Sequence, residues 1–399
     1  MNPSIKLSLL LALVWIACGA SRKGEGFPQG NSNPLPAAHS FQSYIRELKG
    51  KKVGLVVNQT SMVGAVHLVD TLLKQGVRIE KIFSPEHGFR GEADAGEKVA
   101  TTTDPRTGIL LVSLYGEKRK PAPEDLAGLD LLVFDIQDIG VRFYTYISTM
   151  TLLMEACAEN NKPLIILDRP NPNGYFVDGP VLRPEFKSFI GMHPVPVVYG
   201  MSIGEYALMV NGEKWLSNGA QCALKVIPCA NYDHTMTYDL PVRPSPNIPS
   251  LRSTLLYPSI CFFEGTNCSE GRGTEAPFVI FGHPKYSKGD YQFTPVSRPG
   301  AKNPKLLHQL CNGHNLSNLS IEEIMSWKRI NLKWLIQFYA DMKDKDPFFL
   351  ANNFFNRLAG NDVLMAQIKA GKTEEEIRAS WKADLDAFKK VREKYLLYE

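Results

Sequence analysis

Short apolar runs rich in β-branched residues alternate with amphipathic segments through the first two-thirds of this 399-residue chain, and this alternation constrains the fold more than any other feature. The apolar runs predict strands at residues 52–58, 79–83, 109–114, 131–135, 164–168, 195–199 and 224–227. The amphipathic segments predict helices at residues 66–75, 146–159 and 203–215. Near-continuous apolar strands separated by helices are typical of a mostly parallel α/β sheet with helices on both faces, a Rossmann-like arrangement.

The pattern changes after residue 257. A section rich in Gly and Pro extends to residue 304, and mainly helical sequence follows it, ending in a long helical pattern at residues 374–395. We therefore expect a Rossmann-like catalytic domain at residues 41–257 and a smaller C-terminal α+β domain at residues 258–399 that completes the active-site cleft.

The first 20 residues predict a signal peptide, because Lys6 precedes an apolar run at residues 7–17 that is shorter than the ~20 residues needed to cross a bilayer. Cys18 lies where the lipidated cysteine of a lipoprotein stands, and the alternative is cleavage after Ala20. Residues 21–40 are polar and predict a flexible linker. We expect an exported protein, a periplasmic or outer-membrane-associated lipoprotein that meets the membrane only through its N-terminal lipid anchor.

Composition bears on two questions, whether a nucleic acid is a partner and whether disulfide bonds form. The formal net charge is +4, from 45 basic and 41 acidic residues, and no basic block interleaved with aromatics occurs, so no nucleic-acid partner is expected. Six cysteines besides Cys18 are scattered and lack CxxC spacing. The pairs Cys222 with Cys229 and Cys261 with Cys268 are conceivable disulfides, but buried free thiols are the prediction.

The first predicted strand is followed by Asn58-Gln59-Thr60-Ser61, without a GxGxxG or P-loop lysine, so no nucleotide and no other cofactor is predicted. Ligands of open α/β folds bind at the carboxyl ends of the strands. Side chains directly after the apolar runs are therefore the candidate site, and Asn58 is the first of them.

The stretch SPEHGFRG at residues 84–91 follows the second strand and suits neither helix nor strand. Its Glu86 is a candidate proton donor, with His87 and Arg90 to hold the donor or the substrate. The alternative for His87 is a hydrogen bond within its own loop.

The stretch FDIQDIGVRFYTY begins at residue 134 and combines carboxylates, an amide, an arginine and aromatic rings, which together suit a sugar. Its candidates are Gln137, Asp138, Arg142 and Tyr144. The alternative is that Asp138 caps the next helix and that the tyrosines belong to the core.

Two further stretches carry polar side chains between Gly and Pro residues. They are LDRPNPNG from residue 167 and CFFEGTNCSEGRGTEAPF from residue 261. Asp168 and Arg169 either contribute to the site or form an ion pair that braces it. The other candidates from these stretches are Asn171, Glu264, Asn267 and Arg272.

Six stretches in this order, SPEHGFRG, DIQDIGVRFYTY, LDRPNPNG, RPSPNIPS, FFEGTNCSEGRGT and KYLLY, resemble the exo-β-N-acetylmuramidases of the NamZ type. The resemblance covers residues 48–398 and implies a peptidoglycan hydrolase with a Rossmann-like domain and a smaller C-terminal domain. It implies release of N-acetylmuramic acid from non-reducing ends of peptidoglycan fragments, a step in cell-wall recycling. The proposed catalytic glutamate of the family lies in the loop that matches residues 84–91, which points to Glu86.

Glycoside hydrolysis ordinarily uses two carboxylates, and Asp138 and Glu264 are the candidates for the second. The 2-acetamido group of the substrate could instead attack the anomeric carbon, with a protein carboxylate steadying it.

An arginine suits the lactyl carboxylate of muramic acid because its planar fork matches that group. The candidates are Arg90, Arg142, Arg169 and Arg272, with Arg90 or Arg142 favoured.

Two other functions remain open from the sequence. A metal-dependent hydrolase would use Glu86, His87, Asp135 and Asp138 as ligands, although no paired histidine spacing supports it. A surface lipoprotein would bind glycans without cleaving them.

Overall fold

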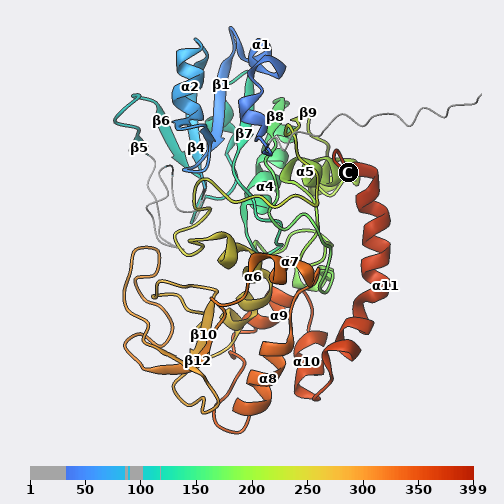
Figure 1. The fold of residues 1–399 in the computed structure, drawn as a ribbon. Coiled ribbons are helices and arrows are strands. Elements are labelled where there is room, and N and C mark those ends of the chain that lie inside the picture. The colour runs from blue at the N-terminus through green and yellow to red at the C-terminus, as the bar shows by residue number, and fades with distance from the viewer. Residues whose placement is uncertain (1–32, 86–88, 90–101, 117) are drawn as a thin grey trace, which may run out of the picture. The chain divides into compact units, whose positions relative to one another are not determined.

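A seven-stranded sheet organises the first part of the chain in a computed structural model, which describes residues 33–85, 89, 102–116 and 118–399 (Figure 1). The strand order is β5-β6-β4-β1-β7-β8-β9. The strands are β1 (Lys52–Val57), β4 (Arg78–Ser84), β5 (Thr102–Thr103), β6 (Leu110–Ser113), β7 (Leu131–Asp135), β8 (Leu164–Leu167) and β9 (Leu224–Ile227). All neighbouring pairs are parallel except β5 with β6, which confirms the predicted mostly parallel sheet.

Both faces of this sheet are buried, because successive side chains of a strand point to opposite sides. In β7, Leu131 and Val133 belong to a core shared with α1 (Ile45–Leu48) and α2 (Leu68–Lys74). Leu132 and Phe134 belong to the opposite core, shared with α4 (Tyr146–Glu159) and α5 (Ile203–Gly212). Helices therefore cover both faces, as the apolar runs predicted.

The strand order reverses at one place. From β1 the chain proceeds outward through β4 and β6, and it then returns to the other side of β1 with β7, followed outward by β8 and β9. The carboxyl ends of β1 and β7 flank this topological switch point, where open α/β sheets bind ligands. A ligand site is therefore expected among the loops after these strands and after their neighbours β4 and β6.

Several predicted elements have the observed bounds, including β7, α4 and β9. The predicted strand at residues 195–199 is wrong. Its segment makes only isolated bridges through Val198, and its carbonyl groups at Val195 and Val197 accept hydrogen bonds from Leu182 and Arg142. An apolar run predicts burial, but it does not distinguish a strand from a buried irregular segment.

The C-terminal part combines a small antiparallel sheet with helices, as predicted. In its sheet, β12 (Cys311–Asn315) lies between β10 (Ile280–His283) and β11 (Tyr291–Phe293). Its helices are α6 (Leu251–Ile260), α7 (Ile321–Ser326), α8 (Lys333–Met342), α9 (Phe354–Ala359), α10 (Val363–Lys369) and α11 (Glu374–Arg392). The proposed boundary after residue 257 falls within α6, and the division into two domains stays a prediction.

Ordered contacts begin before residue 41, the predicted first residue of the folded part. Leu35 pairs with Ala230, and Ala37 and Ala38 are fully buried in the 3₁₀ helix Ala37–His39. Polar composition alone does not reveal such docking. A short hairpin of β2 (Met62–Val63) and β3 (Val66–His67) completes this region.

All six cysteines of the described residues are buried free thiols, as predicted. Among the helices of the same residues, none combines the length and the apolar character that spanning a membrane requires. Cys18 lies outside the described residues.

The last residues of the chain return to the Rossmann-like part after α11, drawn in red in Figure 1. The Tyr398 hydroxyl accepts a hydrogen bond from the Cys229 amide at 2.7 Å and donates one to Asp168 Oδ2 at 2.7 Å. The amides of Leu397 and Tyr398 donate to Glu205 Oε1 at 2.8 and 3.3 Å. The chain end therefore supplies donors to two fully buried carboxylates.

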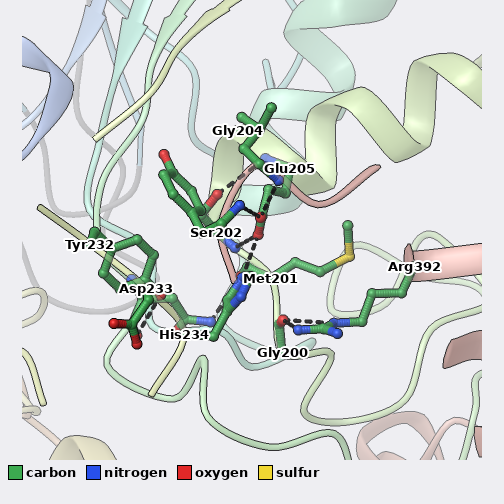
Figure 2. A network of polar contacts seen from close by, with 12 residues as sticks. Gly200, Met201, Ser202, Gly204, Glu205, Tyr232, Asp233, His234 and Arg392 are labelled. Carbon is green, nitrogen blue, oxygen red and sulfur yellow. Dashed lines mark hydrogen bonds and ion pairs between the residues drawn. The ribbon is translucent and has the colours of Figure 1, made fainter. Parts of the chain in front are cut away.

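Figure 2 shows the surroundings of one of these carboxylates. Glu205 Oε2 accepts the Ser202 amide at 2.8 Å and lies 2.8 Å from His234 Nε2. Nearby, the Arg392 side chain reaches the carbonyl oxygen of Gly200, with Nε at 2.8 Å. The N-terminus of α5 is thus held by contacts from far along the chain.

Changing Tyr398 to Phe should destabilise the fold, because the variant removes a hydroxyl that serves one buried donor and one buried acceptor. A loss of about 1–3 kcal/mol is expected for a buried group left without its partner. Tyr395→Phe is the matched control, since its hydroxyl meets the partly exposed Glu213 at 2.8 Å and its removal should change stability by less than ~0.5 kcal/mol. Urea unfolding measures both, and equal losses would contradict the proposed role of Tyr398.

Candidate active-site pocket

A cavity of about 430 Å³, a volume typical of small-ligand sites, lies beyond the strand ends. The segments after β6 and β7 form part of its wall, and loops and helices from the later chain form the rest. Its lining residues are Tyr115, Arg119, Phe143, Tyr144, Thr145, Tyr146, Ser188, Phe189, Ile190, Ser245, Asn247, Ile248, Tyr257, Glu264, Arg272, Phe278, Phe354 and Arg357.

Aromatic rings packed edge to face form much of this wall. The Tyr144 ring lies 5.1 Å from that of Tyr146 and 6.1 Å from that of Tyr257, which in turn lies 4.7 Å from Phe278. The Tyr144 hydroxyl donates to the carbonyl of Pro244 at 2.6 Å, and burial raises the pKa of this phenol well above its ordinary range. The rings are therefore fixed and neutral, and such surfaces suit the apolar faces of a sugar.

Glu264 enters the pocket as half of a charge pair. Arg272 donates to Glu264 Oε1 from Nη2 at 2.6 Å and from Nε at 3.1 Å, and its Nε is 3.4 Å from Glu270 Oε1. Burial alone would lower the pKa of Arg272, but the carboxylates of Glu264 and Glu270 outweigh it and raise that pKa above its ordinary value. The pocket thus holds a carboxylate oriented by a permanently charged guanidinium.

Asp138, the other candidate for a second carboxylate, is not among the lining residues. Its Oδ2 accepts hydrogen bonds from the Gly140 amide at 2.7 Å and from the Tyr199 hydroxyl, while Oδ1 has no partner among the described residues. Burial raises the pKa of this carboxyl from 3.8 to about 6, although the bonds from Tyr199 and Gly140 oppose the shift. Its charge also contributes to the raised pKa of Tyr144, so Asp138 is coupled electrostatically to the pocket wall.

The stretch around Asp168 braces the strand ends. The suggested ion pair of Arg169 with Asp168 is wrong, because the Arg169 side chain instead forms a buried two-point ion pair with Asp135, the last residue of β7, from Nε at 2.6 Å and Nη2 at 2.8 Å. Asp168 Oδ1 accepts the amides of Gly204 and Arg169, and its Oδ2 accepts the hydroxyls of Ser202 and Tyr398. Burial raises the pKa of Asp168 to about 6. None of these side chains lines the cavity.

The predicted amide side chains also connect loops to one another. Asn58 Oδ1 accepts the Thr60 amide at 2.9 Å. Gln137 Nε2 donates to the carbonyl of Pro170 at 2.7 Å, and Asn171 Nδ2 donates to that of Met201 at 2.8 Å. Asn267 is half-buried and also lies outside the lining.

Arg142 is fully buried and makes three hydrogen bonds to backbone carbonyls. Its Nη1 donates to Pro180 and Val195, and its Nη2 donates to Leu358, each at 2.8 Å. The residue is absent from the pocket lining, so it presents no donor there for a substrate carboxylate.

Glu86, His87 and Arg90 lie outside the described residues. The strand that precedes them does lead to the pocket, because the carbonyl of Ser84, the last residue of β4, accepts the amide of Leu114 at 2.8 Å. Tyr115, the next residue, lines the cavity.

Sequence patterns did not identify several lining residues. Arg119 stands in a charged run typical of solvent-exposed surface. Phe354 and Arg357 lie on one face of α9, and the sequence alone does not indicate what that face contacts. Asn247 lies within RPSPNIPS, so the resemblance was the available signal for it.

The donor set of a metal-dependent hydrolase is not assembled in the described part of the chain. Both carboxylate oxygens of Asp135 accept hydrogen bonds from Arg169. No cluster of three or more potential ligands occurs among the described residues.

An aromatic-walled pocket with a carboxylate and arginines, beyond the carboxyl edge of a Rossmann-like sheet, fits a carbohydrate-processing α/β enzyme. Family comparison agrees with this class. The N-terminal domain of the exo-beta-N-acetylmuramidase NamZ family matches residues 53–252, and the C-terminal domain of that family matches residues 255–398. The chain therefore belongs to the NamZ family of exo-β-N-acetylmuramidases, a family of glycosidases.

Individual relatives support this membership. The chain is 39% identical over 373 residues to the peptidoglycan beta-N-acetylmuramidase NamZ of Bacillus subtilis (strain 168), covering 89% of each chain. Two DUF1343 family crystal structures from Bacteroides fragilis NCTC 9343 are also similar. They share 48% and 29% identity with TM-scores of 0.86 and 0.76, each covering 92% of this chain and 99% of the other.

Replacing Asp138 by Asn should reveal the titration of this buried carboxyl. Because the pKa of Asp138 is raised from 3.8 to about 6 in the folded chain, its contribution to stability is fully present below 3.8 and lost as pH rises through about 6. The stability of wild type relative to Asp138→Asn should fall by roughly 2 kcal/mol between pH 4 and pH 8. Urea unfolding across this range measures the difference, and a constant value would contradict the raised pKa.

Proposed function

We propose that this chain is an exo-acting glycoside hydrolase that releases N-acetylmuramic acid from the non-reducing end of peptidoglycan fragments without a cofactor. Family membership over residues 53–252 and 255–398 is the observation that carries the proposal. The pocket agrees with it, since fixed aromatic rings, a carboxylate and arginines suit an anionic sugar.

Glu86 is the proposed general acid. It stands two residues after Ser84, the end of a strand at the sheet edge that leads to the pocket, and in the loop that matches the family's proposed catalytic glutamate. Protonation of the leaving oxygen is the step that a glycosidase needs from such a group.

Glu264 is the proposed second carboxylate, because among the described residues it is the carboxylate that lines the cavity. With Arg272 orienting it, Glu264 would stabilise positive charge developing at the anomeric carbon or steady the 2-acetamido group during its attack. Asp138 would stabilise the pocket wall without lining it, through its hydrogen bonds with the Tyr199 hydroxyl and the Gly140 amide.

The purified chain from Pro34 onward should release N-acetylmuramic acid from a chromogenic β-muramide and from a disaccharide with a non-reducing muramoyl residue, without added metal. Glu86→Gln should reduce kcat by roughly 10²- to 10⁴-fold, since it keeps the shape but removes the acid. Glu92→Gln changes the next glutamate along the chain and is the matched control, expected near wild-type activity.

Three results would count against this assignment. Internal cutting of intact glycan strands would contradict exo action, and zinc-restored activity after chelation would favour a metal-dependent hydrolase. Tight binding of the disaccharide without any product would indicate a glycan-binding protein.

We also propose that Cys18 is lipidated and anchors the exported protein to a membrane, as the apolar run before it suggests. Cys18→Ser should abolish lipidation and leave the protein either uncleaved or released in soluble form after cleavage at Ala20. Metabolic labelling with a fatty acid and membrane fractionation measure this. Unchanged labelling and membrane association would exclude Cys18 as the acceptor.

A further inference from the structure

Among the described residues that line the pocket, arginines outnumber carboxylates. The guanidiniums of Arg119, Arg272 and Arg357 line it together with the carboxylate of Glu264. Arg272 is matched by Glu264 at 2.6 Å and by Glu270 at 3.4 Å. Arg119 and Arg357 have no acidic partner among the described residues, so this part of the wall attracts anions.

Arg119 differs from both of its chain neighbours. Lys118 pairs with Asp125, and Lys120 pairs with Glu159 at 2.7 Å. The Arg119 guanidinium instead lies with its Cζ 4.2 Å above the ring of Phe189, another lining residue. A cation–π contact at this distance limits the movement of the guanidinium, while its N–H donors, which lie in the plane of the group, have no acidic partner in the described part of the chain.

The substrate of the proposed reaction carries a matching group. Muramic acid differs from glucosamine by a lactyl ether that ends in a carboxylate, and the planar fork of an arginine binds a carboxylate through two parallel hydrogen bonds. We infer that Arg119, seated on Phe189, binds the lactyl carboxylate and selects muramoyl over glucosaminyl residues. Arg119 has this role only if the proposed substrate class is correct.

Arg119 is preferred over Arg357 because of the element that carries it. Arg119 follows β6, and the end of β6 pairs with the end of β4 at Ser113 and Ser84. Arg119 therefore follows the same sheet edge as Ser84, two residues before Glu86 in the sequence. In muramic acid the carbon that carries the lactyl ether is two carbons from the anomeric carbon. Arg357 comes from α9 in the C-terminal part.

Of the four arginines that the sequence suggested, Arg90 lies outside the described residues, and the other three are less suited to this role. Arg142 and Arg169 are buried outside the lining, bonded to backbone carbonyls and to Asp135 respectively. Arg272 already meets two carboxylates.

The test compares kcat/KM for a chromogenic β-muramide, for the methyl ester of its lactyl group and for the corresponding glucosaminide. Arg119→Met should lower the value for the muramide ten- to a hundredfold while leaving the ester and the glucosaminide within about twofold. Arg119→Lys should give an intermediate loss, because it keeps the charge but not the fork. Arg183→Met, an exposed arginine outside the pocket and 3.7 Å from Asp362, is the control and should match wild type.

Direct binding separates this inference from the proposed function. Free N-acetylmuramic acid and N-acetylglucosamine are titrated by NMR into wild type, Arg119→Met and Arg357→Met. If wild type prefers muramic acid and Arg119→Met loses that preference, the inference holds even where no turnover occurs, and only the hydrolase assignment fails. A wild type without preference, an Arg119→Met variant that retains it, or its loss in Arg357→Met alone would overturn the role of Arg119.

Discussion

The buried ion pair between Asp135 and Arg169 is the contact on which the carboxyl edge of the sheet depends. It joins the last residue of β7 to the second residue after β8, and both side chains are withdrawn from solvent. Removing one partner of such a pair leaves an uncompensated charge in the interior, which is strongly destabilising. The two neighbouring loops after β7 and β8, beside the switch point, are therefore fixed relative to each other before any ligand binds.

Around this pair the site is arranged in two layers. The inner layer contains Asp138 and Asp168, whose oxygens accept hydrogen bonds from loops and from the chain end. The outer layer, including Tyr144 and Glu264, faces the cavity. Burial raises the pKa of both inner carboxyls to about 6. The protonation of these two groups, which lie outside the pocket lining, therefore changes with pH near 6. Rigid support of this kind is what holds catalytic groups in productive geometry.

The apolar runs predicted the sheet well because its strands are buried on both faces and leave a nearly continuous pattern. They also located the loops at the strand ends. Which side chains of those loops face a ligand was not predictable, because long-range contacts decide it. Arg142 is turned away from the pocket by carbonyls as distant as that of Leu358, and Asp168 receives its hydroxyl from Tyr398. No local pattern contains such information, which is also why the segment at residues 195–199 was mistaken for a strand.

The arginines near the strand ends illustrate how partners, rather than residue type, assign a role. The guanidinium of Arg142 donates to three backbone carbonyls and holds their segments together. The guanidinium of Arg169 pairs with the buried carboxylate of Asp135 and holds two loops together. Arg272 is shared between two carboxylates and orients one of them towards the pocket. Arg119 is exposed and rests on an aromatic ring, and among the described residues its N–H groups have no acidic partner, so they are open to solvent or to a ligand. A guanidinium already placed on a ring loses less ordering entropy than a free side chain when an anionic ligand binds it.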